Sequence, residues 1–595
     1  MLPGGGRRVR EPRWLPVCVG VGLALVALAA AAIVGFLAVG VGSGSLDAGA
    51  LLTSPEWDPI RGHYGGAAMI WGTAAVGAVG LALAAPLGWG VAVAINELAP
   101  RRLRSVLRAS SELLAVVPSI VYGLVGIVYV RPLVAQLTGS VGGDSLLAAG
   151  LVLAVMVLPT IVAVSIDALA AVPLAAREAA AALGLRRTEV IRAAVLPYAR
   201  RGMGAAALLG LARALGETVA VFLLVGRADG RLPSLGGVFS ALAEPGQTLT
   251  TKLNSPESVL AGTSGAHWAA LCGLGLVLLL VVASLTAVGL HRSERAPGAA
   301  PTLWRRGRAP RGAAPARELR DRATRVGLLV LLAVPPALFA GVAVAAAARG
   351  PAVFDPGFWL SPASGASGGG IRDQLLGTLL LVATAGVLAA PVGLSLGLVA
   401  SEYAPNACAR WLRVATVTLA GVPSIVLGLA GYYVFSVTLG WGKSWLAGAI
   451  LLAVIAIPVV ALAVAARVDA LPAERREAAE ALGLRRGQLV RSVLMPHARP
   501  ALATGLLLGL ARAAGETAPL LFVATVTSGA GPLPGGVTDA PVLALPTHIF
   551  NLAQDAVDPA ALHAAWGAAA ALLAIAGLLL LAAVPARRRM EAPVP

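Results

Sequence analysis

The sequence predicts an all-α polytopic membrane protein built from two similar halves. The chain of 595 residues is 58% hydrophobic and only 13% charged, with a mean hydropathy of +0.83. A soluble protein of ordinary composition contains less apolar sequence than this. Apolar runs recur along the chain, many of them longer than the roughly 18–20 residues that span a bilayer. Charged phrases of the first half return in the second at a fixed spacing, which indicates an internal repeat.

Six apolar runs are expected to span the membrane in each half. In the first half they lie at 15–41, 66–96, 111–136, 146–166, 204–226 and 266–290. In the second half they lie at 326–348, 373–400, 411–437, 446–467, 501–526 and 564–585. The halves are therefore 1–290 and 326–595, and the Pro-, Gly- and Arg-rich stretch 291–325 is expected to be a flexible linker in the cytoplasm.

Arginine residues orient these spans. Four arginines precede the first span, ten lie between 292 and 325, and three follow the last span. Because cytoplasmic loops collect Arg and Lys, the sequence predicts a multi-pass protein of the plasma (cytoplasmic) membrane with both termini in the cytoplasm. The net charge of +17 is then mainly a topology signal, and nucleic-acid binding is the weaker interpretation.

The repeat extends over most of each half. Three pairs of phrases match at a spacing of 305 residues: GTAAVGAVGLALAAPLG at 72–88 with GTLLLVATAGVLAAPVG at 377–393, NELAP at 96–100 with SEYAP at 401–405, and VPSIVYGLVG at 117–126 with VPSIVLGLAG at 422–431. The spacing is expected to fall to 302 at Asp167 and Asp469 (469 − 167) and to 299 further on. An even number of spans per half predicts parallel repeats that pair around a central pathway.

A charged loop precedes the fifth span of each half. EAAAALGLRRTEVIRAAVLP at 178–197 matches EAAEALGLRRGQLVRSVLMP at 477–496, 299 residues apart (477 − 178). Each begins with helix formers, turns at a glycine, and continues as a second amphipathic piece that is expected to end at its proline. Apolar faces are expected to carry Ala179, Leu183 and Val190. Such an elbow suits docking into a partner's groove, and the alternative is an interfacial helix on anionic lipid. The occurrence in both halves favours docking.

A second charged phrase lies inside an apolar run of each half, GLARALGET at 210–218 and GLARAAGET at 509–517. It is expected to place two Arg–Glu pairs about midway along a span: Arg213 with Glu217, and Arg512 with Glu516. A charge at that depth costs roughly 2.5–3.5 kcal/mol, and the i, i+4 spacing lets Arg and Glu neutralise each other. The arginine fork suits oxyanions, phosphate above all, so these four residues form a hypothetical substrate pathway. The alternative is a buried ion pair that only fixes helix packing.

The loops at 178–197 and 477–496 resemble the EAA loop of ABC importer permeases, roughly E-A-A-x3-G-x9-I-x-L-P, although the Ile position holds Ala194 and Val493. The residues that match the first part of this motif are Glu178, Ala179, Ala180 and Gly184, and Glu477, Ala478, Ala479 and Gly483. The resemblance implies a type I, MetI-like permease repeat in each half, whose loop inserts into a cleft of an ATPase subunit.

The intramembrane phrases resemble those of the permeases of the phosphate-specific (Pst) ABC importer. GLARALGETVAV at 210–221 places the first half with the PstC type, and GLARAAGETAPLLF at 509–522 places the second with the PstA type. The resemblance implies a fusion of two subunits into one permease for inorganic phosphate. It also implies that Arg213, Glu217, Arg512 and Glu516 take part in phosphate passage.

The implied partners are two copies of an ATPase subunit, an extracytoplasmic phosphate-binding protein, inorganic phosphate and membrane lipid, with no nucleic acid. The sequence Gly442-Lys443-Ser444 is no phosphate loop, because Val437 stands where that motif needs glycine. We therefore expect a permease subunit that is not itself an enzyme and binds no cofactor or metal, while the partner uses ATP.

Three alternatives remain open on the sequence. The first is a secondary anion transporter with two parallel six-helix repeats, which would not need the long elbow found in each half. The second is a scaffold that senses phosphate without moving it. The third is an ABC permease for another oxyanion, such as sulfate or molybdate.

Overall fold

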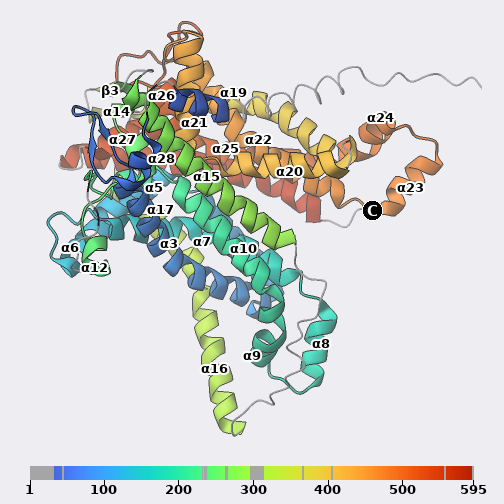
Figure 1. Ribbon diagram of the computed structural model, residues 1–595. Helices are drawn as coiled ribbons and strands as arrows, with labels where there is room; N and C mark the ends of the chain where they lie inside the picture. Colours follow the sequence, from blue (N-terminus) through green and yellow to red (C-terminus); the bar gives the residue numbers. More distant parts are fainter. Residues whose placement is uncertain are drawn as a thin grey trace, which may run out of the picture.

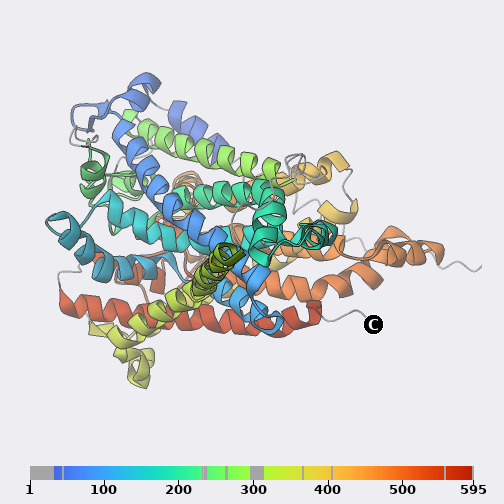
Figure 2. The same ribbon diagram turned by 90° about the horizontal axis from the view of Figure 1, so that it is seen from below.

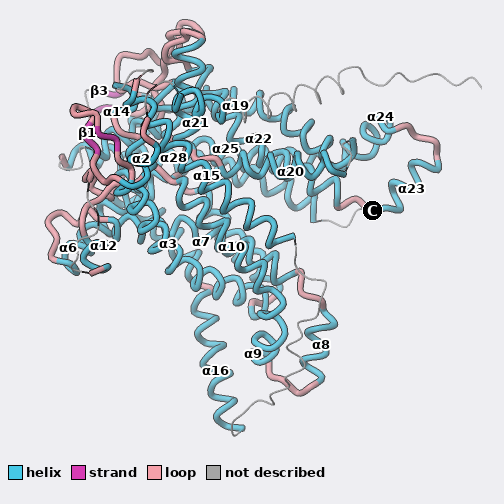
Figure 3. The backbone as a smooth tube through the Cα atoms, viewed as in Figure 1, coloured by secondary structure: helices cyan, strands magenta, loops and turns pink. Residues whose placement is uncertain are grey.

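The computed structural model describes residues 33–591, except 43, 45, 231, 233–236, 261–264, 295–313, 365–367, 404–405 and 555–557. The protein is 79% helical, which confirms the predicted all-α class (Figure 3). Strands in the described part form only two short hairpins, Trp57–Asp58 (β1) with His63–Tyr64 (β2) and Ala363–Ser364 (β3) with Gly368–Gly369 (β4). The predicted span 15–41 lies largely outside the described residues, and its end belongs to the helix Ile33–Gly42.

The described residues of the first half form five long helices and several short ones, whose arrangement Figure 1 shows. The long helices are α3 (Ala67–Val93), α4 (Arg101–Val116), α7 (Leu146–Ala170), α10 (Leu196–Gly216) and α15 (Ala266–Glu294). The short α-helices are α2 (Ala48–Thr53), α5 (Ser119–Val125), α6 (Arg131–Thr138), α8 (Leu174–Ala182), α9 (Arg187–Val190), α11 (Val219–Phe222), α12 (Val238–Ala243), α13 (Leu249–Leu253) and α14 (Glu257–Leu260). Three π-helical turns join them: η1 (Ala94–Leu98), η2 (Gly126–Val130) and η3 (Ile191–Val195).

The second half repeats this plan. Its long helices are α16 (Ala314–Leu331), α17 (Val334–Arg349), α19 (Arg372–Leu398), α20 (Asn406–Gly421), α22 (Trp445–Asp469), α25 (Met495–Ala514) and α28 (Pro559–Glu591). The short helices are η5 (Pro351–Phe354), α18 (Pro356–Leu360), α21 (Ser424–Gly431), α23 (Ala473–Ala481), α24 (Arg486–Leu489), α26 (Ala518–Val523) and α27 (Leu545–Gln554). The π-helical turns are η6 (Val399–Tyr403), η7 (Tyr432–Thr438) and η8 (Val490–Leu494).

Nine helices in the described part are long and apolar enough to cross a membrane, or ten if one bent pair is a single span. The bent pair, Ala409–Gly421 with Ser424–Thr438, turns by 91° at the proline of the second VPSI phrase, where a continuous span over 411–437 was expected. The expected span 204–226 is not among these helices. Instead α10 begins at Leu196, takes in two further arginines and ends at Gly216.

Helix packing confirms the internal repeat. In the first half α3 packs on α7, α7 on α10 and α10 on α15, and in the second half α19 packs on α22, α22 on α25 and α25 on α28. Helices α7 and α22 have 25 residues each and are capped by Ser145 and Ser444, so the spacing of 299 (444 − 145) already applies there. The expected spacing of 302 at Asp167 and Asp469 is therefore wrong. Asp469 is the last residue of α22, whereas Asp167 lies three residues before the end of α7.

The repeated Gly-Thr that opens the 72–88 phrase has a packing role. A Cβ on Gly72 would lie 2.0 Å from the carbonyl oxygen of Gln247, so only glycine fits this contact. The adjoining Thr73 hydroxyl accepts a hydrogen bond of 2.9 Å from the amide of Leu249, the first residue of α13. Gly377 and Thr378 make the same contacts with the chain entering α27. The first half therefore holds a short helix against α3, and the second half holds one against α19, in the same way.

The two halves pack against each other because helices of each half contact helices of the other. α15 of the first half packs on α20 of the second, and α17 and α28 of the second half pack on α4 of the first. Figure 1 shows the helices of the two halves close together near α26 and α27 and diverging toward α8 and α23, and Figure 2 shows the long red helix α28 along one side of the molecule. The interface between the halves is thus an integral part of the core.

Helix α16 occupies the end of the stretch for which a flexible linker was expected. It packs on α9 and α3 of the first half. Asp321 is buried there and accepts hydrogen bonds from the hydroxyl (2.5 Å) and the amide (3.3 Å) of Thr188. Arg325 pairs with Asp321 at 2.9 Å. Residues 314–325 are therefore ordered helix docked on the first charged loop, while 295–313 lie outside the described residues.

Candidate translocation site and coupling elements

The helix that carries each intramembrane phrase is broken at its glutamate. α10 ends at Gly216, Glu217 is extended (φ −73°, ψ 132°), and α11 begins at Val219. In the second half α25 ends at Ala514, followed by Gly515, Glu516 and the start of α26. The arginines therefore lie in the last turn of their helices. The sequence had led us to expect them about midway along a span. Discontinuous membrane helices of this kind expose backbone groups and favour ion or substrate sites.

The start of α10 also differs from expectation. Pro197 was expected to end the amphipathic piece of the charged loop, but it lies in the first turn of α10. A proline is tolerated there because the first amides of a helix have no intrahelical acceptor. α9, η3 and α10 consequently follow one another without interruption from Arg187 to Gly216. The second half has the same arrangement.

Both Arg–Glu pairs face one small cavity between the halves. Arg213 Nε lies 3.9 Å from Glu217 Oε1, and Arg512 Nε lies 3.9 Å from Glu516 Oε1. All four side chains line a cavity of about 40 Å³ together with residues 114–119, Tyr122, Met156 and Gly515. The four charges sum to zero, which limits the cost of holding them inside the membrane. The structure thus brings together the four predicted pathway residues, 299 positions apart in sequence (512 − 213), in one site.

Each broken helix packs against the VPSI break of the opposite half. A Cβ on Gly515 would lie 2.9 Å from Cβ of Pro118, and one on Gly216 would lie 3.6 Å from Cα of Pro423. The glycine of the second phrase is therefore needed for close approach to the first half. These reciprocal contacts place the charged pair of one half beside the helix break of the other.

The two arginines differ in their hydrogen bonds. Arg213 donates to Thr160 Oγ1 at 3.0 Å and to the carbonyl of Ala115 at 3.5 Å. Arg512 has Val459 at the position that matches Thr160 (459 − 160 = 299) and donates no hydrogen bond to any described residue. Arg512 is also the more exposed of the two, 36% against 29% for the side chain. Its donors are accordingly available to a ligand.

The charged loops form the predicted elbows. α8 ends before Gly184, which has φ +73°, and α23 ends before Gly483, which has φ +72°. Only glycine adopts this left-handed conformation without strain, so both elbows turn at the predicted residue. Beyond each turn an arginine amide, Arg186 or Arg485, donates at 2.9 Å to the side chain three residues later.

The apolar face of the first elbow points outward, contrary to expectation. Ala179 is exposed and Leu183 is 65% exposed, whereas Ala180 is buried. The matching Leu482 is 81% exposed, and Glu178, Glu477 and Ala478 are also exposed. Of the three residues expected on apolar faces, Val190 is half-buried and packs against the core of the first half, whereas Ala179 and Leu183 stay exposed. The exposed Leu and Glu side chains therefore form matching exposed surfaces on the two elbows.

A salt bridge that occurs at matching positions of both repeats, called the staple below, was missed from the sequence. Arg177 binds Glu97 with one guanidinium nitrogen 2.6 Å from each carboxylate oxygen, and Arg476 binds Glu402 at 2.8 Å. Each arginine also donates to a carbonyl at the end of the preceding span. Both glutamates are only 10% exposed. The signal was present, because the glutamates belong to the repeated NELAP and SEYAP phrases and each arginine directly precedes its EAA motif.

This fold and these elements define a membrane permease made of two fused repeats. Each repeat has a broken, charged helix at the shared interface and a glycine elbow at the end of the preceding spans. The chain belongs to the family of binding-protein-dependent transport system inner membrane components, whose sequence model matches residues 84–292 and 389–589. Membership confirms the predicted MetI-like permease repeat in each half and a multi-pass membrane protein. It removes the secondary-transporter alternative.

Named relatives differ between the halves. The first half is similar to the phosphate transport system permease protein PstC of Mesorhizobium japonicum, 32% identical over 263 residues, or 41% of this chain and 78% of that protein. PstC of Xylella fastidiosa is 32% identical over 320 residues, 49% of this chain and 95% of that protein. The second half is similar to PstA 2 of Mycobacterium bovis, 40% identical over 176 residues, 30% of this chain and 58% of that protein. No solved structure matched the chain.

Proposed function

We propose that the chain is the complete permease core of an ATP-driven importer of inorganic phosphate. The observation that carries this proposal is the single cavity at which Arg213, Glu217, Arg512 and Glu516 meet. The names of the relatives of both halves support phosphate as the cargo. One fused chain then supplies both sides of the pathway.

The geometry of the pairs suits transient anion binding. A strong charge-assisted hydrogen bond has a length of about 2.7–2.9 Å, whereas each Arg–Glu contact here is 3.9 Å. The arginine donors are therefore only partly used by the glutamates, and a tetrahedral oxyanion can bridge the two forks. As the anion leaves, Glu217 and Glu516 pair again with the two arginines. This competition keeps the site from trapping the anion permanently.

ATP hydrolysis is coupled to transport through the elbows. Two ATPase subunits dock on α8 and α23, hydrolyse ATP and move the elbows, while this chain binds no cofactor. At 1.5 Å per residue the helical stretch from Arg187 to Gly216 extends about 45 Å. It connects the first elbow to Arg213 as one lever. With the elbows and both termini in the cytoplasm, a phosphate-binding protein delivers the anion at the opposite end.

Reconstituted uptake tests this proposal. Proteoliposomes with the full chain, its ATPase and its binding protein are expected to accumulate labelled phosphate on addition of ATP. Excess arsenate should compete and excess sulfate should not. Arg213→Ala and Arg512→Ala are expected to abolish uptake while the amount of protein in the membrane and ATPase binding persist. Normal uptake by both variants, or competition by sulfate alone, would overturn the proposal.

A further inference from the structure

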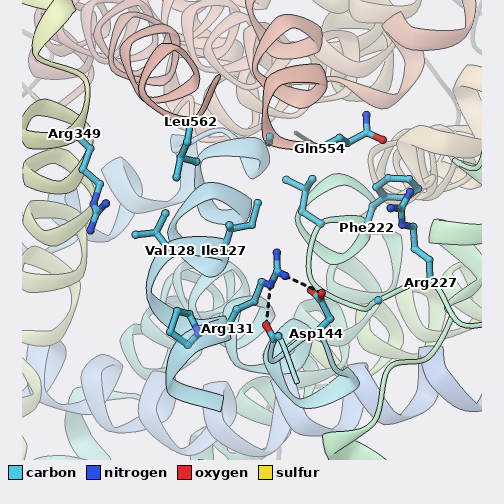
Figure 4. A pocket seen from close by; sticks show the side chains of 14 residues that line it. Ile127, Val128, Arg131, Asp144, Phe222, Arg227, Arg349, Gln554 and Leu562 are labelled. Atoms are coloured by element: carbon cyan, nitrogen blue, oxygen red, sulfur yellow. Dashed lines mark hydrogen bonds and ion pairs between the residues drawn. The ribbon is translucent and has the colours of Figure 1, made fainter. Parts of the chain in front are cut away.

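A second cavity, of about 620 Å³, lies at the end of the molecule away from the elbows. Asp144 lines it and lies two residues before α7, whose other end leads into the first elbow. Residues of both halves form the walls, with Arg131 and Phe222 from the first half and Gln554 and Leu562 from the second (Figure 4). The cavity is therefore another site at the interface of the repeats.

The wall of this cavity is positively charged. Arg131, Arg227 and Arg349 line it with a single carboxylate, Asp144, so the formal charge of the lining is +2 (3 − 1). Arg131 pairs with Asp144 at 2.8 Å and donates to the carbonyl of Gly142 at 3.3 Å. Burial raises the pKa of the Asp144 carboxyl, and the guanidinium groups of Arg131 and Arg227 offset part of that rise. The one acidic group is thus already engaged.

The other two arginines form no ion pair with a described carboxylate. Arg227 stacks on the ring of Phe222, with Cζ 4.6 Å from the ring centre. Arg349 stacks on Tyr129 at 5.0 Å, and its Nε donates to the Tyr129 hydroxyl at 3.1 Å. Stacking fixes a guanidinium plane but leaves donors along its edge for an oxyanion. Figure 4 shows Arg227 beside Phe222 and Arg349 on the opposite side of the cavity.

The backbone conformation of Arg227 supports a binding role for its guanidinium group. Arg227 has φ +54°, a left-handed conformation that is unfavourable for a residue with a side chain. Strain of this kind persists where the surrounding structure holds a residue in place, and it is found preferentially at binding sites. Here it follows Gly226, also left-handed with φ +81°, and it brings the guanidinium over Phe222.

Short segments of the first half connect the outer cavity to the inner one. Tyr122 lines the inner cavity, and Ile127, five residues further along the same helical stretch, lines the outer one. Five helical residues correspond to about 8 Å. Phe222 lines the outer cavity five residues after Glu217, and the centre of its ring lies 5.3 Å from that of Phe550 from the second half. The segment from Glu217 to Phe222 therefore joins the inner Arg–Glu pairs to an aromatic contact in the wall of the outer cavity.

We propose that Arg131, Arg227 and Arg349 form an outer oxyanion site that receives inorganic phosphate before it passes Phe222 and Phe550. The direction and the cargo rest on the proposed function, whereas the charge and shape of the cavity do not. Arg227 and Arg349 supply free donors, and Asp144 sets the strength of binding by holding Arg131. The site is a waiting position, distinct from the inner Arg–Glu pairs.

Equilibrium dialysis with labelled inorganic phosphate tests the outer site. The full chain is used in lipid nanodiscs without ATPase or binding protein, in an Arg512→Gln background that weakens the inner site. Combined Arg227→Gln and Arg349→Gln substitutions are expected to weaken phosphate binding at least tenfold. Asp144→Asn is expected to strengthen it severalfold, a gain that misfolding does not produce. Arg61→Gln, at an exposed arginine of another loop, is the matched control.

Unchanged affinity in the double arginine variant, or weaker binding in Asp144→Asn, would overturn the outer site. Uptake by the complete reconstituted transporter separates this result from the proposed function. Phosphate transport by the wild type together with normal binding and uptake in the arginine variants would refute the outer site alone. Arginine-dependent phosphate binding in a chain that never transports phosphate would refute the proposed function and leave the outer site standing.

Discussion

The two Arg–Glu pairs come from matching phrases, yet their surroundings differ. Arg213 donates to Thr160 and to a backbone carbonyl of the helix before the VPSI break, and Tyr122 lies in the same cavity. Arg512 faces that cavity and pairs with Glu516, but it donates no hydrogen bond to any described residue, since Val459 stands at the position of the threonine. The repeat therefore preserves charge and spacing but not the anchoring of the charge. We infer that Arg213 is the fixed cation of the site and Arg512 the adaptable one.

The largest effect is expected at the adaptable cation. Arg512→Gln removes a fork that donates no hydrogen bond to any described residue, and two charged hydrogen bonds to the anion at about 1.5 kcal/mol each correspond to roughly a 100-fold loss. Arg213→Gln is expected to cost about tenfold, since part of that fork is used by the protein. Initial rates of labelled phosphate uptake in proteoliposomes measure both. Equal losses would contradict the division into fixed and adaptable cations.

The elbows are expected to behave alike, in contrast to the arginines. Arg177→Ala and Arg476→Ala each leave a nearly buried glutamate without its cation. Breaking a fully buried pair costs about 3–5 kcal/mol, and the partial exposure of both arginines lowers this. We expect about a tenfold drop in phosphate transported per ATP hydrolysed, equal within twofold for the two variants. Arg200→Ala, at an exposed arginine of α10, is the control and should leave the ratio unchanged. Full coupling in either staple variant would show that Glu97 and Glu402 do not hold the elbows.

An exchange of the anchoring residue sharpens the comparison. Thr160→Val gives Arg213 the neighbour that Arg512 has, and Val459→Thr gives Arg512 the neighbour that Arg213 has. The first is expected to strengthen phosphate binding about threefold and the second to weaken it about threefold, since a neutral hydrogen bond contributes roughly 0.5–1.5 kcal/mol. Equilibrium dialysis with the purified chain measures both. Shifts in the same direction would indicate packing effects and not release of a guanidinium.

The sequence predicts the membrane class, the repeat, the glycine turn of both elbows and the four charged residues that line the inner cavity, because each depends on local composition or short spacing. Their role in a pathway stays a prediction. The sequence does not predict the helix breaks at Glu217 and Glu516, nor the contact of Gly515 with Pro118 of the other half. The contact forms only when the break in one half packs against the break in the other, and these two segments are far apart in the sequence. The outward-facing Leu183 was missed for a related reason. Amphipathic spacing identifies an apolar face but does not say whether the chain itself or a partner covers it.

The smallest effect is expected where α16 docks on the first elbow. Asp321→Asn removes the charge that binds Thr188 and Arg325, and we expect a loss of about 1–2 kcal/mol in the local stability of this contact. Hydrogen–deuterium exchange of α16 and α9 should rise, while that of α24 in the other half should stay unchanged, because no described helix docks on α24 in the same way. Uptake should change less than twofold, since α16 supports the elbow and does not contact the Arg–Glu pairs. A matching rise in α24 would mean that the substitution loosens both halves and that α16 is no local support.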